Sequence, residues 1–162
     1  MPERAPVVYD VNVLVNVLVA EDSEFPYIAQ VPPASSNPDA DCLSIAFDAN
    51  DFQLYLSPHI LENTTRVLAE LGLSPDLIER YLATLVDVVE TSGGAIVDPP
   101  RKVFDVRDHE DNLILDLAVD VDAAIVVSND TDLTSLSPWH NRVAIMRPRD
   151  FVQRTVQTRR GR

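Results

Sequence analysis

Cysteine, positive charge and long apolar stretches are all scarce in this chain. The chain has a single cysteine, Cys42, which excludes an internal disulfide framework. We interpret Cys42 as a small core residue and not as a nucleophile. No apolar run approaches the roughly 18 residues that a membrane-spanning helix needs. The opening MPERAPVVYD lacks the basic-then-apolar order of a secretion signal. We therefore expect a cytoplasmic protein that does not enter a membrane.

The few basic residues are unevenly placed. The net charge is −13, which argues against a simple basic nucleic-acid binder. Residues 142–162 hold seven arginines and one aspartate, a net charge of +6, which leaves −19 for residues 1–141. Two interpretations fit this distribution. One is a solvated acidic surface with a solubilising tail, and the other is a divalent-metal site in the body with a tail that contacts a polyanion.

What the chain does contain is an alternation of strand-like and helix-like segments in one domain of 162 residues. Short, continuously apolar segments predict strands buried on both faces of a parallel sheet, at 7–10, 53–57, 95–98, 123–128 and 142–146. Capping and periodicity predict helices from Ser57-Pro58 to Gly72, from Ser74-Pro75 to Gly93, at about 109–121, and from Pro148. Residues 12–20 fit either element, and residues 31–41 are predicted to be a loop. We predict an α/β domain over residues 1–150, with residues 151–162 as its basic C-terminal helix or tail.

A carboxylate interrupts the most apolar run of the chain, VVYDVNVLVNVLVA, at Asp10. Ligands of such sheets bind outside the carboxyl ends of the strands, where Asp10 and Asp130 both fall. Glu62 and Asp111 lie in early turns of helices that can open onto the same edge. Four acids without Cys or His nearby are typical of a site for a hard divalent ion, Mg²⁺ or Mn²⁺.

Each of these acids also has an ordinary interpretation by itself. Asp111 could interact with a helix dipole, Asp130 could be a turn residue, and Glu62 could lie on a solvated helix face. Only their convergence in one predicted place favours a site. Other polar residues are interpreted as surface, turn or bystander positions: Asp116, Asp120, Asp122, His59, His109 and His140.

The order of the motifs resembles that of PIN domains, and specifically PIN-type ribonuclease toxins of toxin–antitoxin pairs. The matching blocks, which span about residues 7 to 151, are VVYDVNVLV, LYLSPHILENTTRVL, DHEDNLILDLAVDVDA, IVVSNDTDL and IMRPRDF. The resemblance implies a three-layer α/β/α sandwich with an open, mostly parallel five-stranded sheet, and it makes residues 12–20 a helix. The chain departs from the family pattern at three places. Val11 stands where Thr or Ser is usual, Asn129 replaces the usual small residue, and the region 21–50 is longer than in compact members.

The same resemblance implies roles for individual residues. The metal-binding and catalytic acids would be Asp10, Glu62, Asp111 and Asp130. Supporting positions would be Asn12, Asp108, Asn112, Ser128 and Asp132. Apart from the resemblance, Arg66 could contact a phosphate or pair with an acid, and the charge distribution predicts RNA contacts at the C-terminal arginines Arg154, Arg159, Arg160 and Arg162.

The function that follows is a Mg²⁺- or Mn²⁺-dependent endoribonuclease, the toxin of a toxin–antitoxin pair. Its expected partners are an RNA substrate, a cognate antitoxin and, as a further possibility, a second copy in a homodimer. A PIN-like binding module without catalytic activity is the alternative. A phosphatase of the dehalogenase type is disfavoured, because its motif needs an aspartate where this chain has Asn12.

Overall fold

A four-stranded, all-parallel sheet forms the centre of the computed structural model, which describes residues 3–20, 23, 25 and 36–162. The strands are β1 (Ala5–Tyr9), β2 (Phe52–Tyr55), β3 (Ile125–Val127) and β4 (Ala144–Met146). Their order in the sheet is β2-β1-β3-β4. Four of the predicted strands are thereby confirmed, and β1 lies in the middle of the sheet between β2 and β3.

The predicted fifth strand, residues 95–98, is wrong for the described part of the chain. Only Ile96 pairs with the sheet there, through a single parallel bridge to Leu56. The Leu56 N–H donates to the Ala95 carbonyl at 3.3 Å, and the Val97 N–H donates to the Leu56 carbonyl at 2.9 Å. Two prolines follow at positions 99 and 100. Because proline has no N–H to donate, the ladder cannot continue.

The predicted helices are present, and side-chain caps explain where they begin. They are α1 (Val11–Val19), α3 (Pro58–Glu70), α4 (Pro75–Ser92), α5 (His109–Asp120) and α7 (Pro148–Arg160). The caps of α3 and α4 are Ser57 and Ser74, each followed by proline at the first helical position. Despite its valines, residues 11–19 form a helix, as the resemblance implied.

Two further helices were not predicted from the sequence. Helix α2 (Pro38–Asp48) begins inside the segment 31–41 that was predicted to be a loop, and residues 31–35 lie outside the described residues. The short helix α6 covers Thr131–Thr134. In α2, Asn37 caps the helix and Pro38 occupies its first turn. The proline that suggested a break therefore marks a helix start, where its missing N–H is not needed.

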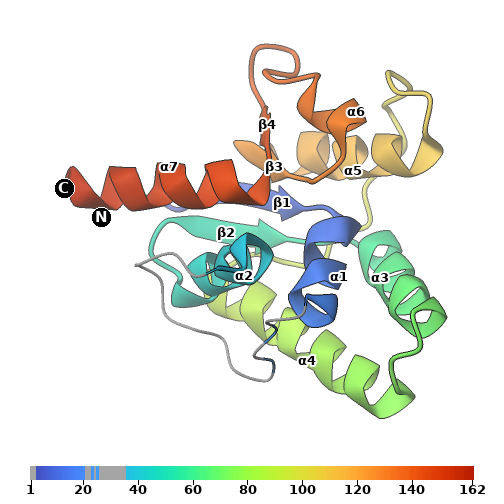
Figure 1. The fold of residues 1–162 in the computed structure, drawn as a ribbon. Helices are drawn as coiled ribbons and strands as arrows, with labels where there is room; N and C mark the ends of the chain where they lie inside the picture. Colours follow the sequence, from blue (N-terminus) through green and yellow to red (C-terminus); the bar gives the residue numbers. More distant parts are fainter. Residues whose placement is uncertain (1–2, 21–22, 24, 26–35) are drawn as a thin grey trace.

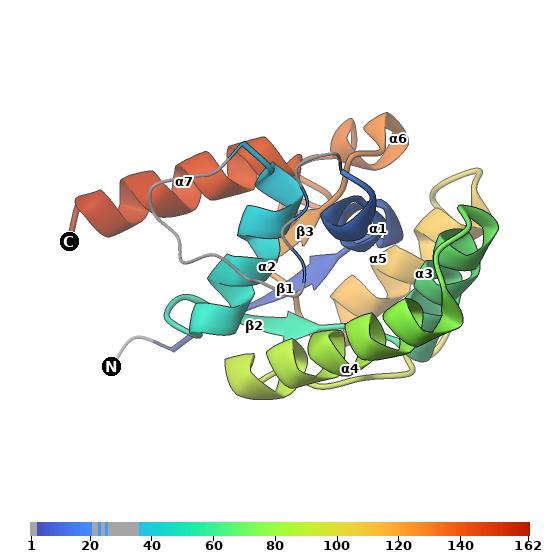
Figure 2. The same ribbon diagram turned by 60° about the horizontal axis from the view of Figure 1, so that its bottom comes forward.

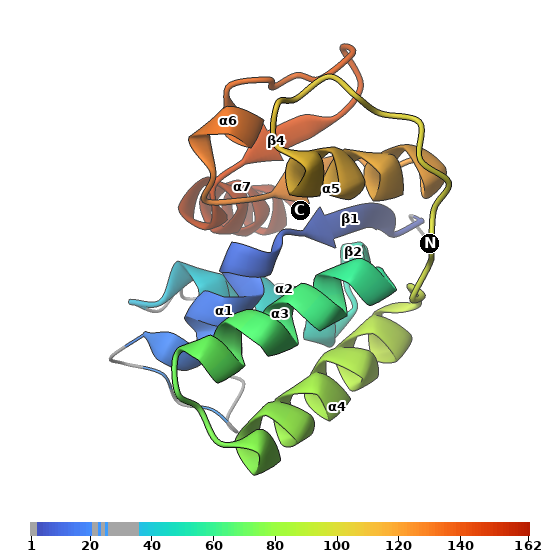
Figure 3. The same cartoon turned by 90° about the vertical axis from the view of Figure 1, so that its right-hand side faces the viewer.

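The helices form layers on both sides of the sheet, as the three-layer prediction required. Figure 1 and Figure 3 show α5 on one side of the sheet and α1, α3 and α4 on the other. Figure 2 shows α2 beside α7, and α2 also contacts α4 and α1. The core between these layers contains the largest fully buried side chains, among them Tyr9, Tyr81 and Phe151. No helix of the described residues is both long and apolar enough to cross a membrane.

The C-terminal helix α7 belongs to this core. Phe151 is fully buried, with its ring centroid 5.9 Å from that of Tyr9 and 4.9 Å from that of Phe52. Near the other end of the helix, Arg159 forms ion pairs with Asp48 at 2.9 Å and Asp51 at 2.6 Å. Apolar packing thus holds the start of α7 to β1 and β2, and ion pairs hold its end to the turn between α2 and β2.

The backbone of Gly94 lies against β2 so closely that no side chain fits. An added Cβ atom would lie 1.8 Å from the Leu54 carbonyl oxygen and 2.6 Å from its carbon. This close approach allows the neighbouring Ala95 to pair with Leu56. The glycine is therefore required by backbone contact and not by an unusual φ angle.

Gly94→Ala is expected to lower the free energy of unfolding by roughly 3 kcal/mol, because two backbone segments would have to separate. Gly161→Ala is the matched control, because its added Cβ would meet atoms no closer than 3.6 Å. The control should change stability by less than about 0.5 kcal/mol. Urea unfolding measures both, and equal midpoints for the two variants would contradict the predicted clash.

Arg159→Gln should lower the free energy of unfolding by about 2 kcal/mol, because the largely buried Asp51 carboxylate loses one of its two arginine donors. Burial would raise the pKa of Asp51, but hydrogen bonds from Arg162 and Arg159 hold it below its ordinary value. The contribution is therefore present above the ordinary aspartate pKa and is lost as pH falls through the lowered one. Unfolding at pH 7 and at pH 3 tests this, with the exposed Arg160→Gln as control. A deficit that does not shrink in acid would be the contrary result.

Candidate active site

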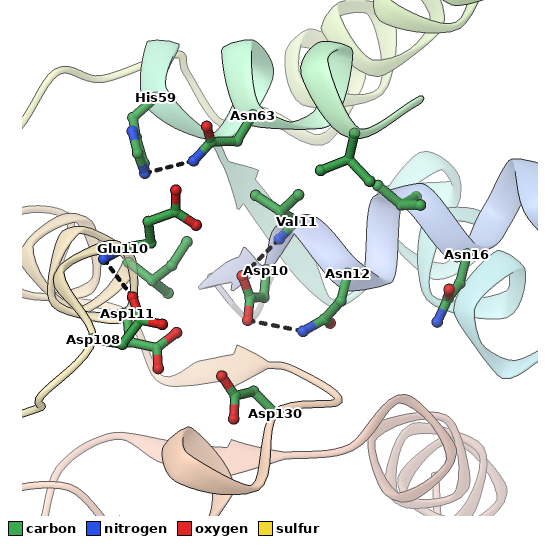
Figure 4. A pocket seen from close by; sticks show the side chains of 13 residues that line it. Asp10, Val11, Asn12, Asn16, His59, Asn63, Asp108, Glu110, Asp111 and Asp130 are labelled. Carbon is green, nitrogen blue, oxygen red and sulfur yellow. Dashed lines mark hydrogen bonds between the residues drawn. The ribbon is translucent and has the colours of Figure 1, made fainter. Parts of the chain in front are cut away.

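A pocket of about 280 Å³ opens where β1 and β3 end and where α1, α3, α5 and α6 come together (Figure 4). Two groups of side chains line it. The acidic wall consists of Asp10, Asp108, Glu110, Asp111 and Asp130. The α3 wall consists of His59, Asn63 and Val67, and the remaining lining comes from Val11, Asn12, Val15, Asn16 and Ile114. Three of the four predicted acids therefore converge.

Asp10 is almost completely buried and is held in place by hydrogen bonds. One carboxylate oxygen, Oδ1, accepts from the Val11 N–H at 2.7 Å, so Asp10 also caps α1. The other, Oδ2, accepts from the Ser128 hydroxyl at 2.7 Å and from the Asn12 amide at 3.2 Å. Burial raises the pKa of Asp10, and these hydrogen bonds oppose the rise. The predicted supporting roles of Ser128 and Asn12 thus correspond to contacts with Asp10.

Asp111 faces the pocket from the first turn of α5 without a partner for one of its oxygens. Its side chain is 6% exposed, and Oδ2 has no hydrogen-bond partner. Burial is the main reason that the pKa of Asp111 is raised to about 7, and the charge of Asp130 is the next. Asp108 and Asp10 act in the same direction. An ionised, buried and unpartnered oxygen is costly unless a cation binds it.

The long loop before α5 is fixed by two buried polar side chains of that helix. Asn112 accepts from the Val106 N–H at 2.9 Å and donates to the Val106 carbonyl at 2.7 Å. Asp116 accepts from the N–H groups of Lys102 and Val103, both at 2.7 Å. Asp116 is therefore a buried loop anchor, and its interpretation as a surface residue was wrong. These anchors bring the start of α5 to the pocket.

Asp130 and Asp132 complete the cluster beside Asp111. Asp130 follows β3 and caps α6 by accepting from the Asp132 N–H at 2.9 Å, while its own N–H donates to Ser128. One carboxylate oxygen from each of Asp111, Asp130 and Asp132 lies within 4.8 Å of the other two. Three carboxylates, one with an unpartnered oxygen, fit a hard divalent cation such as Mg²⁺ or Mn²⁺. Asp108 lies on the edge of this cluster, where it caps α5.

Glu62 is not brought together with the other predicted acids. It is exposed on α3 and does not line the pocket. The positions of α3 that do line it, His59, Asn63 and Val67, are spaced by four residues, so they share one face of the helix. Glu62 lies about 100° away from Asn63 around the helix axis. An Asn and a His thus face the pocket where the sequence interpretation expected a carboxylate.

Several site residues were missed from the sequence. His59 was given no role because it shows no ligand spacing, although the four-residue spacing with Asn63 and Val67 marks one helix face. Asp39 is linked to the site through Asn129, whose amide donates to Asp39 at 2.9 Å and whose backbone N–H donates to Asn12 at 3.0 Å. Nothing local in the sequence indicates the role of Asp39, because α2 itself was not predicted.

The predicted RNA-binding arginines lie in different surroundings. Arg66 reaches the rim of the pocket, where it pairs with Glu110 at 3.4 Å. Arg154 and Arg160 are exposed on α7. Arg159 is engaged with Asp48 and Asp51, so it is an intramolecular ion-pair residue rather than a free cation. The C-terminal end of α7 lies at the far end of the sheet from α1, α3 and the pocket (Figure 1).

The profile of a PIN domain family matches residues 6–132, a stretch that runs from β1 to α6 and includes all residues of the acidic wall. This chain belongs to the PIN domain family. PIN domains are generally metal-dependent nucleases, and the acidic cluster of this PIN domain is compatible with metal binding. A search of curated proteins finds no match.

A divalent cation should stabilise this PIN domain most strongly at neutral and alkaline pH. Because the pKa of Asp111 is raised to about 7, the metal-free protein loses stability as pH rises from about 4 through 7. Mg²⁺ competes with the proton, so the increase in Tm on adding Mg²⁺ should grow over the same range. At a hundredfold excess over Kd the stabilisation is about 2.7 kcal/mol.

Thermal unfolding in EDTA and in Mg²⁺ between pH 5 and pH 8 measures this effect. Asp111→Asn should remove both the pH dependence and most of the Mg²⁺ effect, because the titrating carboxylate is gone. Asp120→Asn, at the exposed end of the same helix, should keep both. A wild-type Tm that does not respond to Mg²⁺ at any pH would contradict the metal site.

Proposed function

We propose that this PIN domain is a metal-dependent endoribonuclease that hydrolyses RNA phosphodiester bonds with Mg²⁺ or Mn²⁺. The observation that carries the proposal is the unpartnered Oδ2 of Asp111 beside Asp130 and Asp132, in the pocket that Asp10 also lines. Crowded acids with raised pKa values are common at functional sites, since purely structural packing gains nothing from like-charge repulsion.

Residues of the acidic wall, together with the neighbouring Asp132, would hold the ion and the reacting groups. Asp111, Asp130 and Asp132 would hold the ion, which when bound supplies an activated water and stabilises charge on the phosphate. Asp10 presents a carboxylate whose orientation is fixed by Ser128, Asn12 and its own helix. That rigid orientation avoids reorganisation at the moment of reaction. Hydrolysis in this arrangement would leave a 5′-phosphate and a 3′-hydroxyl.

The biological setting of the nuclease follows from the resemblance to PIN-type toxins. In that setting the chain is a cytoplasmic toxin, its activity is restrained by a cognate antitoxin, and it pairs with a second copy as a homodimer. Support for these assignments comes from the motif order of residues 7–151 alone. Purifying the native complex and sequencing the ends of cleaved RNA would test all of them together.

One observation favours a second candidate, a PIN-like binding module without catalytic activity. The α3 wall presents His59, Asn63 and Val67 to the pocket, so no described residue of α3 adds a carboxylate there. The ligand set is then limited to β1, α5 and α6. The two candidates differ in one measurable respect, because only the nuclease converts RNA into products when Mg²⁺ is present.

Asp10→Asn should reduce Mg²⁺-dependent RNA cleavage by at least a hundredfold while the fold is retained, because it removes charge without changing shape. Glu62→Gln is the matched control, and it should keep activity within a few-fold because Glu62 lies outside the pocket. Cleavage of a labelled single-stranded RNA, with Tm as the check on folding, measures both. Undiminished cleavage by Asp10→Asn would overturn the catalytic role of Asp10. Loss of cleavage in Glu62→Gln would show that Glu62 takes part in the reaction.

A further inference from the structure

The two walls of the pocket differ in chemistry. Every residue of the acidic wall carries a carboxylate, whereas the α3 wall carries an imidazole and an amide. Figure 4 shows His59 and Asn63 together on α3, with Asp10 and Asp111 between that helix and Asp130. A metal ion would have its ligands at Asp111 and Asp130 of the acidic wall and at the neighbouring Asp132. The α3 wall offers hydrogen-bond donors to whatever else enters.

A chain of hydrogen bonds along α3 orients these donors. The Arg66 guanidinium donates to Asn63 Oδ1 at 3.2 Å, which leaves the Asn63 amide N–H groups to face His59. The Asn63 Nδ2 atom lies 2.9 Å from His59 Nε2. In the arrangement in which the Asn63 amide donates to Nε2, His59 has Nδ1 left to donate to a ligand. The sequence places the three residues at positions 59, 63 and 66, consecutive turns of one helix.

Arg66 is not committed to its present partners. Its ion pairs with Glu110 at 3.4 Å and with Glu70 at 3.5 Å join side chains that are at least half exposed. Exposed pairs of this kind contribute little to stability, so exchanging one for a phosphate has a low cost. Arg159, in contrast, is 15% exposed and is held by two carboxylates. Of these two arginines, Arg66 is the one available beside the pocket.

We propose that His59, Asn63 and Arg66, the α3 donor strip, form a subsite for a backbone phosphate of single-stranded RNA next to the scissile bond. His59 and Arg66 contact the phosphate, and Asn63 is a positioning residue that sets the imidazole. The proposal rests on the proposed function for the identity of the polyanion. Its physical basis is that the acidic wall repels RNA, so attraction must come from the ion and from the remaining wall.

The pocket has room for both occupants. Its volume of about 280 Å³ compares with a share of about 30 Å³ for each molecule of liquid water. An ion held by the carboxylates and a phosphate group against α3 therefore have room side by side. The C-terminal end of α7 is not part of this pocket, since it lies at the far end of the sheet from α1 and α3 (Figure 1).

RNA binding in the absence of cleavage tests the subsite directly. Fluorescence anisotropy with a labelled single-stranded RNA, in Mg²⁺, would compare Asp10→Asn alone with the same protein carrying His59→Ala or Arg66→Gln. We expect each second change to raise Kd about tenfold, the usual loss for one hydrogen bond to a charged group. Arg66→Gln should also lower the log–log salt slope by roughly 0.7, the contribution of one phosphate contact.

Two variants are matched controls. His109→Ala removes an exposed histidine at the start of α5 that does not line the pocket, and Arg80→Gln removes an arginine of an exposed ion pair on α4. Both should leave Kd within twofold. If His59→Ala and Arg66→Gln bind like these controls, the subsite is overturned. Because Arg66 is exposed, its variant should fold even if the histidine variant does not.

Steady-state cleavage with Asp10 intact gives the second readout. His59→Ala and Asn63→Ala should raise KM about tenfold with smaller changes in kcat, and Asn63→Gln, which keeps an amide, should recover part of the loss. Their increase in Tm with Mg²⁺ should equal that of the wild type, which separates the subsite from the metal cluster. Losses confined to kcat, or a lost Mg²⁺ response, would overturn the subsite.

The outcomes for the two proposals are distinct. Cleavage that is indifferent to His59 and Arg66 would overturn the subsite and leave the nuclease in place. RNA binding that depends on both residues, by a wild-type protein that cleaves nothing, would overturn the nuclease and leave the subsite as part of a binding module. An absence of RNA binding would overturn both.

Discussion

The crowding of carboxylates at the ends of β1 and β3 is the constraint on which the rest of this structure depends. Asp10 and Asp111 are each only 6% exposed, and one oxygen of Asp111 has no partner. Neighbouring hydrogen-bonding residues hold these acids in place, although the carboxylates repel one another. Ser128 and Asn12 fix Asp10, and Asn112 and Asp116 fix the loop that delivers Asp111. A fold optimised for stability alone would not keep this arrangement.

Much of the fold could be predicted from the sequence, because the local signals agree with the tertiary structure. The apolar strands, the Ser-Pro caps of α3 and α4, and the acids Asp10 and Asp130 at strand ends are all local features. Helix α2 was missed because its first turn follows a proline-rich stretch. Pro38 is compatible both with the end of a helix and with its first turn, and the sequence alone does not distinguish the two. The segment 95–98 has the composition of a strand, but the prolines after it prevent further pairing.

The position of Glu62 outside the pocket has a different cause. The sequence shows that an acid lies early in α3, but which side of the helix faces the pocket depends on how α3 is rotated against α1 and α4. A rotation of about 100° exchanges Glu62 for Asn63. Asp116 shows the converse, since an acid on a helix looked like a surface residue until its two backbone donors in the preceding loop were in place. Rotation and distant loops are tertiary properties, and a single sequence does not encode them locally.

The strand order has a consequence for how this protein is made. The central strand β1 is synthesised first, yet one of its neighbours, β2, comes some 45 residues later and the other much later still, since Val7 pairs with Ile125. The outer strand β4 and the buried Phe151 of α7 are later again. During synthesis on the ribosome, the edge of β1 that pairs with β3 therefore stays without its partner for most of the time that the chain is growing. The apolar run that begins in β1 is thus made long before the residues that bury it, and its burial is complete only once Phe151 of α7 packs on Tyr9.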